Sequence, residues 1–182
     1  MQARSRCVEC EFMTAESKPN AVLAIFWGGL LCGVLDIAYA FVFFGAVSGV
    51  RPERLLQGIA FGILGRSTYA GGLTTAALGL FLHFVIAYGA TTVYYFASRK
   101  LHFMVRQAVI AGMLYGVAVH LFMQFVVIPL SAIGPRPVNL GVFVINAIEH
   151  MFLVGLPISL SVRRFSATTQ FDVQTQALRQ PA

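Results

Sequence analysis

Charged residues are scarce in this sequence of 182 residues. Asp, Glu, Lys and Arg together make up 11% of it, whereas hydrophobic residues make up 58%. A soluble domain averages about 25% charged residues, so this chain has too few to cover a surface that faces water. The mean hydropathy of +0.77 likewise indicates a chain that is mostly apolar. We therefore expect the lipid bilayer to be the main solvent of the chain.

The sequence also lacks the motifs of soluble enzymes. It contains no phosphate-binding glycine loop, no Gly-x-Ser-x-Gly nucleophile motif and no dinucleotide-binding glycine pattern. A catalytic role is therefore not favoured, and no cofactor is predicted. The formal net charge of +6 does not indicate nucleic acid, because most basic residues lie beside apolar runs, where they anchor helix ends at lipid headgroups.

Cysteine is rare as well, with only Cys7, Cys10 and Cys32. Cys32 lies within an apolar run, so no disulfide framework is predicted. Cys7 and Cys10 have the spacing of half a zinc or redox site, but no second pair lies nearby. Residues 1–20 are polar and predict a disordered cytoplasmic tail, in which Met13 begins a stretch that resembles a natural translation start.

Four apolar runs are long enough to cross a bilayer as helices, at about 22–45, 72–97, 105–130 and 140–162. We predict an all-α fold, with a four-helix transmembrane domain over residues 21–164 and a polar cytoplasmic tail over residues 165–182. The uncharged run 55–65 is too short to span the membrane. Pro52, Glu53 and Gly65 suit the start and end of a helix, which predicts a short interfacial or re-entrant helix between the first two spans.

The basic residues predict the orientation of the chain. If both termini are cytoplasmic, nine basic residues lie on the cytoplasmic side and four on the outer side. The nine are Arg4, Arg6, Lys18, Arg99, Lys100, Arg106, Arg163, Arg164 and Arg179, and the four are Arg51, Arg54, Arg66 and Arg136. The positive-inside rule therefore favours cytoplasmic termini.

Small residues recur at helical spacing in the first three spans. The stripes are Gly29, Gly33, Asp36 and Ala40; Gly72, Ala76, Gly79, His83, Ala87 and Ala90; and Ala108, Gly112, Gly116, His120 and Gln124. Steps of three and four residues place each set on one helix face, where small residues let membrane helices pack closely. Asp36, His83 and His120 lie on these faces, so we expect them to face the bundle interior.

The fourth span adds three polar residues, which completes a predicted polar layer of Asp36, His83, His120, Asn146, Glu149 and His150. The ionisable groups lie about nine to eleven residues from the outer ends of their spans, which is a depth of about 14–17 Å. That is near the middle of a hydrocarbon core of about 30 Å. A buried Asp costs about 2.5–3.5 kcal/mol at that depth, so we expect carboxylate–histidine pairing.

Three interpretations of this layer remain open. It fixes the helix register as a hydrogen-bonded network, it binds a proton, an ion or a small solute during transport, or it binds a metal or haem. The metal interpretation is the weakest, because no helix carries a Glu-x-x-His or His-x-x-x-His pair. Glu149 and His150 also point about 100° apart on an ideal helix. Besides the lipid bilayer, a second copy of the chain or a larger membrane complex is an expected partner, and nucleic acid is not.

A few short segments can be compared with a known family. They are Gly33-x-x-Asp36, Arg51-Pro-Glu-Arg-Leu-Leu-Gln57, Gly65-Arg66 with Gly71-Gly72, Leu82-His83-Phe84, Pro129-Leu-Ser131 and His150-Met-Phe-x-x-Gly155-Leu-Pro157. Over about residues 22–164 the chain resembles small bacterial inner-membrane proteins, the loosely YagU-like group. The resemblance implies a bacterial inner membrane, no assigned reaction and a broad link to acid tolerance. It also implies that Asp36, His83 and His150 are the stronger site candidates.

Overall fold

The computed structural model describes residues 20–166, of which 88% are helical and none forms a strand. The first half contains α2 (Ala21–Ser48), α3 (Pro52–Leu64), η1 (Gly65–Ala70) and α4 (Gly72–Lys100). The second half contains α5 (Phe103–Arg106), α6 (Ala108–Phe122), η2 (Met123–Val127), α7 (Ile128–Leu130), α8 (Leu140–Glu149), η3 (His150–Gly155) and α9 (Leu156–Ser166). Most of the two predicted tails, with Met13, Cys7 and Cys10, lies outside the described residues.

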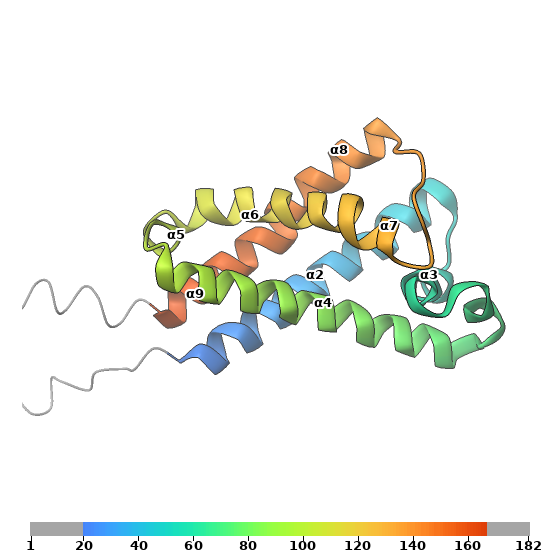
Figure 1. Ribbon diagram of the computed structural model, residues 1–182, viewed down its shortest axis with the longest axis horizontal. Coiled ribbons are helices and arrows are strands. Elements are labelled where there is room, and N and C mark those ends of the chain that lie inside the picture. Colours follow the sequence, from blue (N-terminus) through green and yellow to red (C-terminus); the bar gives the residue numbers. More distant parts are fainter. Residues whose placement is uncertain (1–19, 167–182) are drawn as a thin grey trace, which may run out of the picture.

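Four helical segments are long and apolar enough to cross a membrane: Ala21–Ser48, Gly72–Lys100, Ala108–Leu130 and Leu140–Phe165. The predicted four spans and the shorter helix between the first two are thereby confirmed. Figure 1 shows the long helices running roughly along the longest axis, with the start of α2 and the end of α9 together. There the backbone N–H of Asn20 donates to the carbonyl oxygen of Phe165 at 3.2 Å. We call this the termini end, and the opposite end, where α3 lies, the α3 end.

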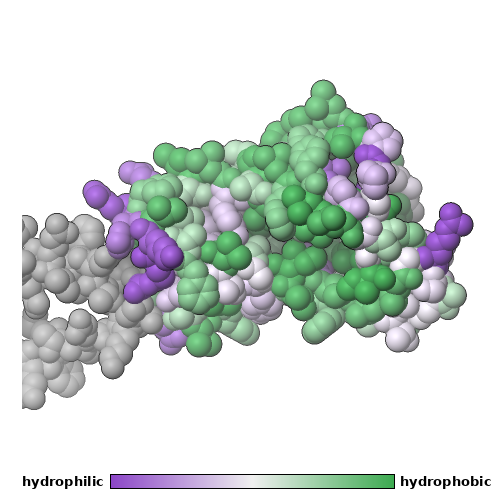
Figure 2. Space-filling model, in the orientation of Figure 1, coloured by the Kyte–Doolittle hydropathy of each residue, from purple (hydrophilic) through white to green (hydrophobic). Residues whose placement is uncertain are grey.

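The surface of the bundle is apolar between these two ends. Figure 2 shows hydrophobic residues covering most of the visible face, with hydrophilic residues gathered toward the ends of the long axis. Large side chains are exposed along the spans, among them Val42, Phe81, Phe96 and Leu114, each more than 60% exposed. A soluble monomer rarely exposes contiguous apolar patches of more than a few hundred Å². This surface therefore suits a lipid environment.

The short helix α3 begins and ends as the sequence predicts. Pro52 is its first residue, where the missing N–H of proline costs no helical hydrogen bond. Glu53 lies in the first turn, next to the positive end of the helix dipole. Gly65 follows the last residue with a φ of 62°, a left-handed conformation that favours glycine. The sequence signals at both ends of α3 are confirmed.

A glycine contact holds α3 against α4. A Cβ atom on Gly79 would overlap the backbone carbonyl of Leu56, so the two helices touch backbone to backbone. Gln57 is 2% exposed, and its Nε2 donates to the carbonyl oxygen of Gly72 at 3.0 Å. Since α3 shares this contact with the first half of α4, it packs as part of the bundle.

We expect Gly79→Ala to lower the free energy of unfolding by about 1–3 kcal/mol, because overpacking displaces α3. Gly89, on the same helix, has nothing within 4 Å of an added Cβ. Gly89→Ala is therefore the matched control, and we expect it to stabilise α4 by up to about 1 kcal/mol through helix propensity. Thermal unfolding in detergent micelles measures both. Equal midpoints for the two variants would contradict the close packing of α3 on α4.

The predicted small-residue stripes lie at helix crossings. Added Cβ atoms on Gly29 and Gly33 of α2 would overlap the rings of Tyr88 and Phe84 on α4. A Cβ on Gly116 of α6 would overlap the carbonyl oxygen of His150. These glycines bring α2 against α4 and α6 against η3, as small residues do in membrane proteins.

Two of the spans contain a π-helical turn. In the third span, η2 covers Met123–Val127, and in the fourth, η3 covers His150–Gly155. Pro157 follows η3 closely and has no N–H to give to the helix. Such π-helical turns occur frequently at functional sites, and both of these contribute residues to the cavity described next.

Candidate functional site

A cavity of about 250 Å³ lies among the helices. Every span contributes a polar side chain to its wall: Asp36 from α2, His83 from α4, His120 from α6, and Asn146 and His150 from α8 and η3. These are five of the six residues of the predicted polar layer. The sixth, Glu149, lies beside the cavity and contacts His150. The structure therefore brings all six residues into one region.

The acidic residues and histidines of the described chain are concentrated here. Residues 20–166 contain three acidic residues, Asp36, Glu53 and Glu149, and four histidines, His83, His102, His120 and His150. Two of the acids and three of the histidines are at the cavity. Ionisable side chains in a membrane interior are costly and pair with one another, so this concentration indicates a site in which carboxylates and imidazoles offset each other.

Asp36 and His83 form the first carboxylate–imidazole pair. The Nε2 atom of His83 lies 2.8 Å from the carbonyl oxygen of Gly33, and a carbonyl can only accept, so Nε2 carries a hydrogen. Nδ1 faces Asp36, whose Oδ2 lies 3.9 Å away. Two unprotonated acceptors repel each other, so an attractive contact between them needs one more proton on either group. The pair is therefore suited to binding a proton.

Glu149 and His150 form the second pair. The Nδ1 atom of His150 lies 2.5 Å from Oε2 of Glu149 and 2.9 Å from the carbonyl oxygen of Asn146. Both neighbours accept hydrogen bonds, so Nδ1 carries a hydrogen. Glu149 is 6% exposed, and a lone carboxylate at that burial would be costly. The imidazole beside it offsets this cost.

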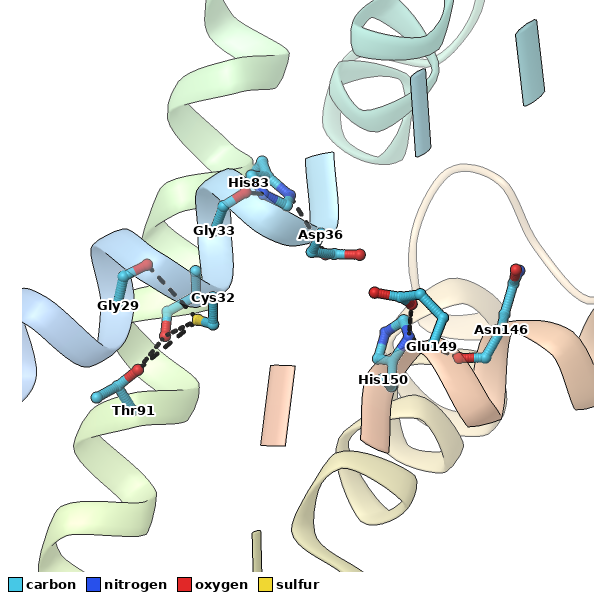
Figure 3. A network of polar contacts seen from close by, with 10 residues as sticks. Gly29, Cys32, Gly33, Asp36, His83, Thr91, Asn146, Glu149 and His150 are labelled. Atoms are coloured by element: carbon cyan, nitrogen blue, oxygen red, sulfur yellow. Dashed lines mark hydrogen bonds and ion pairs between the residues drawn. The ribbon is translucent and has the colours of Figure 1, made fainter. Parts of the chain in front are cut away.

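The two pairs meet across the cavity. Asp36, Glu149 and His150 each offer one ligand atom within 4.8 Å of the others. Figure 3 shows the carboxyl groups of Asp36 and Glu149 pointing toward each other, from two different helices. Two carboxylates at this distance repel each other unless a proton or a cation lies between them. The geometry therefore favours a positively charged occupant.

Two buried polar atoms at this site have no hydrogen-bond partner in the described chain. They are Nε2 of His120 and Oε1 of Glu149, and both residues are 6% exposed. The ring of His120 is packed against that of His150, with 4.9 Å between ring centroids. Buried polar groups almost always have a partner, which can be an ordered water or an ion. The two atoms mark where such a partner would bind.

The cavity reaches one end of the bundle and is blocked toward the other. Arg136, an exposed residue of the segment between α7 and α8, lines it together with Ile59 of α3, so it extends to the α3 end. Toward the termini end lies a packed core of buried side chains. That core includes Tyr94, Ile158 and Val162, each fully buried. The cavity therefore extends toward the α3 end and not into the packed core at the termini end.

The site differs from the sequence-based expectation in two respects. Glu149 and His150 do not point apart, and the expectation of a 100° separation was wrong for their charged ends. His150 begins the π-helical η3, and the long Glu149 side chain turns toward its ring. Gln124 and Arg136 also line the cavity but were not among the candidates. The signal for Gln124 was available, since it follows His120 by four residues on the same stripe.

Comparison of the chain with protein-family models, with curated proteins and with solved structures finds no match. The YagU-like resemblance therefore remains a prediction. The function of the cavity has to be argued from its own residues.

Proposed function

We propose that the chain is a multi-pass protein of the bacterial inner membrane, with both termini cytoplasmic, and that its central cavity exchanges protons during transport of protons or of a small solute. The observation that supports this proposal is the meeting of two carboxylate–imidazole pairs at one cavity that extends toward the α3 end. Histidine and carboxylate exchange protons near neutral pH and form the proton relays of membrane transporters.

The described geometry supports a proton-binding step at Asp36 and His83. The Gly33 carbonyl holds Nε2 of His83, so Nδ1 is the nitrogen directed toward Oδ2 of Asp36. A proton arriving through the cavity binds between these two atoms and makes their contact attractive. The side chain of Asp36 is 27% exposed and lines the cavity. Protons can therefore reach it without unfolding of the bundle.

Transport also requires access from the termini end in a second state. In the described state the packed core around Tyr94 and Val162 closes that end. The crossings at Gly112 and Gly116 hold η3 against α6, and small residues at helix crossings permit sliding of one backbone over another. A shift of η3 along α6 would move His150 relative to Asp36 and expose the site to the other side.

The test is proton flux into proteoliposomes that hold a pH-sensitive dye, under an imposed pH gradient. We expect Asp36→Asn and His83→Gln each to lower the flux at least about tenfold, since positioned acid–base groups commonly contribute factors of about 10²–10⁴ to proton-transfer rates. His102→Gln is the matched control, because His102 is exposed near the termini end and does not line the cavity. We expect it to keep native flux.

Each variant is first checked for membrane insertion and for its unfolding midpoint. Equal flux in native protein and in both cavity variants would reject the proposal. Loss of stability together with unchanged flux per folded molecule would instead assign the polar residues to packing alone.

A further inference from the structure

The carboxylates of Asp36 and Glu149 face each other beside His150, and their surroundings select a particular class of cation. We infer that Asp36, Glu149 and His150 bind a divalent transition-metal ion of the Zn²⁺ class. This inference deepens the proposed function and rests on it for its role in transport, because the ion would occupy the same carboxylates as the proton.

The spacing of the ligand atoms suits a metal ion. The three atoms lie within 4.8 Å of one another and come from α2, α8 and η3. Zn²⁺ holds oxygen and nitrogen ligands at about 2.0–2.2 Å, which places tetrahedral ligands about 3.4 Å apart. The carboxylate of Glu149, which now contacts Nδ1 of His150, and that of Asp36 would rotate onto the ion. The ion would thereby link the first span to the last.

The charge of the cluster also favours a divalent ion. Asp36 and Glu149 together carry two negative charges, which one divalent ion neutralises without protonation of either histidine. An uncompensated charge in the interior is strongly unfavourable. Arg54 is occupied elsewhere, since its guanidinium lies 4.3 Å above the ring of Tyr69. Arg136 lines the cavity as an exposed side chain, and within residues 20–166 it forms no ion pair with Asp36 or Glu149. One divalent ion therefore balances the charge of the Asp36 and Glu149 carboxylates.

The donor atoms distinguish among divalent ions. Imidazole with carboxylate suits Zn²⁺, Mn²⁺ and Fe²⁺, whereas Ca²⁺ takes six to eight oxygen ligands and Mg²⁺ prefers oxygen in an octahedron. The thiol of Cys32 is engaged by the carbonyl oxygens of Gly29 and Ala87, at 3.5 and 4.0 Å. The site thus offers harder donors than the thiolates that select copper(I).

Two features outside the three ligands support the assignment. His150 donates Nδ1–H to the carbonyl oxygen of Asn146 at 2.9 Å, so Nε2 is the nitrogen that would bind the ion. Metal-binding histidines typically make such a second hydrogen bond, which fixes the ring. Nε2 of His120 is buried without a hydrogen-bond partner in the described residues, and His120 lines the same cavity. A water molecule on the open coordination position of the ion would supply that partner.

The experiment is equilibrium binding of Co²⁺ and Zn²⁺ to the full chain, purified without a histidine tag. Cys7→Ser and Cys10→Ser are introduced throughout, since this pair could bind metal by itself. We expect about one ion per chain, with the visible absorption of four- or five-coordinate Co²⁺. We expect Asp36→Asn, Glu149→Gln and His150→Gln each to weaken binding by more than about 100-fold, beyond the ~10–100-fold effect of outer partners.

Asp36→Glu and His102→Gln are the matched variants, because the first keeps a carboxylate and the second removes an imidazole away from the cavity. Retained binding in both, with loss in the three ligand variants, supports the inference. Absence of a bound ion in folded protein, or equal affinity in all variants, overturns it. Metal binding without proton flux would contradict the proposed proton exchange alone, and flux without metal binding would contradict this inference alone.

Discussion

Gly116→Val is expected to prevent assembly of the bundle. An added Cβ on Gly116 would overlap the carbonyl oxygen of His150, and one on Gly155 would overlap the backbone of Gly112. These neighbours are backbone atoms, which cannot rotate away as a flexible side chain does. Overpacking costs about 1–3 kcal/mol where side chains can adjust, so we expect a loss of more than about 3 kcal/mol here. Detergent-resistant folded protein, measured by size exclusion and thermal unfolding, should largely disappear.

The matched control is Gly89→Val, which places the same side chain on an exposed face of α4 with open space around the Cβ. We expect a change within about 1 kcal/mol, because the cost is limited to helix propensity. If Gly116→Val unfolds at the temperature of Gly89→Val, then α6 and η3 do not touch at this crossing. The position of His150 in the cavity would then lack its structural basis.

The fold was largely predictable because its main signals are local. Long apolar runs with basic ends are sufficient to define membrane spans, since the bilayer has a fixed thickness. The short helix α3 was predictable because Pro52 and Gly65 act through their own backbone preferences. The helix crossings at Gly33 and Gly116 followed from spacing on one face, because helical periodicity carries over into packing.

The details of the site were less predictable because they depend on contacts between distant segments. Nothing in the residues of η2 or η3 specifies a π-helical turn, and an ideal helix places Glu149 and His150 on different faces. The contact between Asp36 and Glu149 depends on how α2 lies relative to α8, which no local pattern encodes. Arg136 was counted as a topology signal, and only the tertiary fold brings it to the cavity.

These distant contacts explain why separate tests are needed for the three interpretations of the polar layer. A register-fixing network, a proton site and a metal site use the same side chains. They differ in what must reach the cavity, since a network needs no access and both sites need a water path. Whether water reaches the cavity, and from which side, is therefore the decisive property.

Accessibility should differ sharply between the two ends of the bundle. In a background with Cys7→Ser, Cys10→Ser and Cys32→Ala, we expect Gln124→Cys to react with a membrane-impermeant maleimide from one side of the membrane only. Gln124 is half-buried and lines the cavity, whereas Val162 lies fully buried in the core toward the termini end. We expect Val162→Cys to react on the order of 1,000-fold more slowly, because exposing it requires an opening of about 4 kcal/mol.

Two exposed positions identify the sides in this labelling experiment. Arg66→Cys lies at the α3 end and Arg99→Cys at the termini end, and both side chains are exposed. We expect Gln124→Cys to share the sidedness of Arg66→Cys, since the cavity extends to Arg136 and Ile59. Labelling of Gln124→Cys from the Arg99 side, or from neither side, would contradict access from the α3 end. A proton or a metal ion would then lack its path to Asp36, and the register-fixing network would be the remaining interpretation.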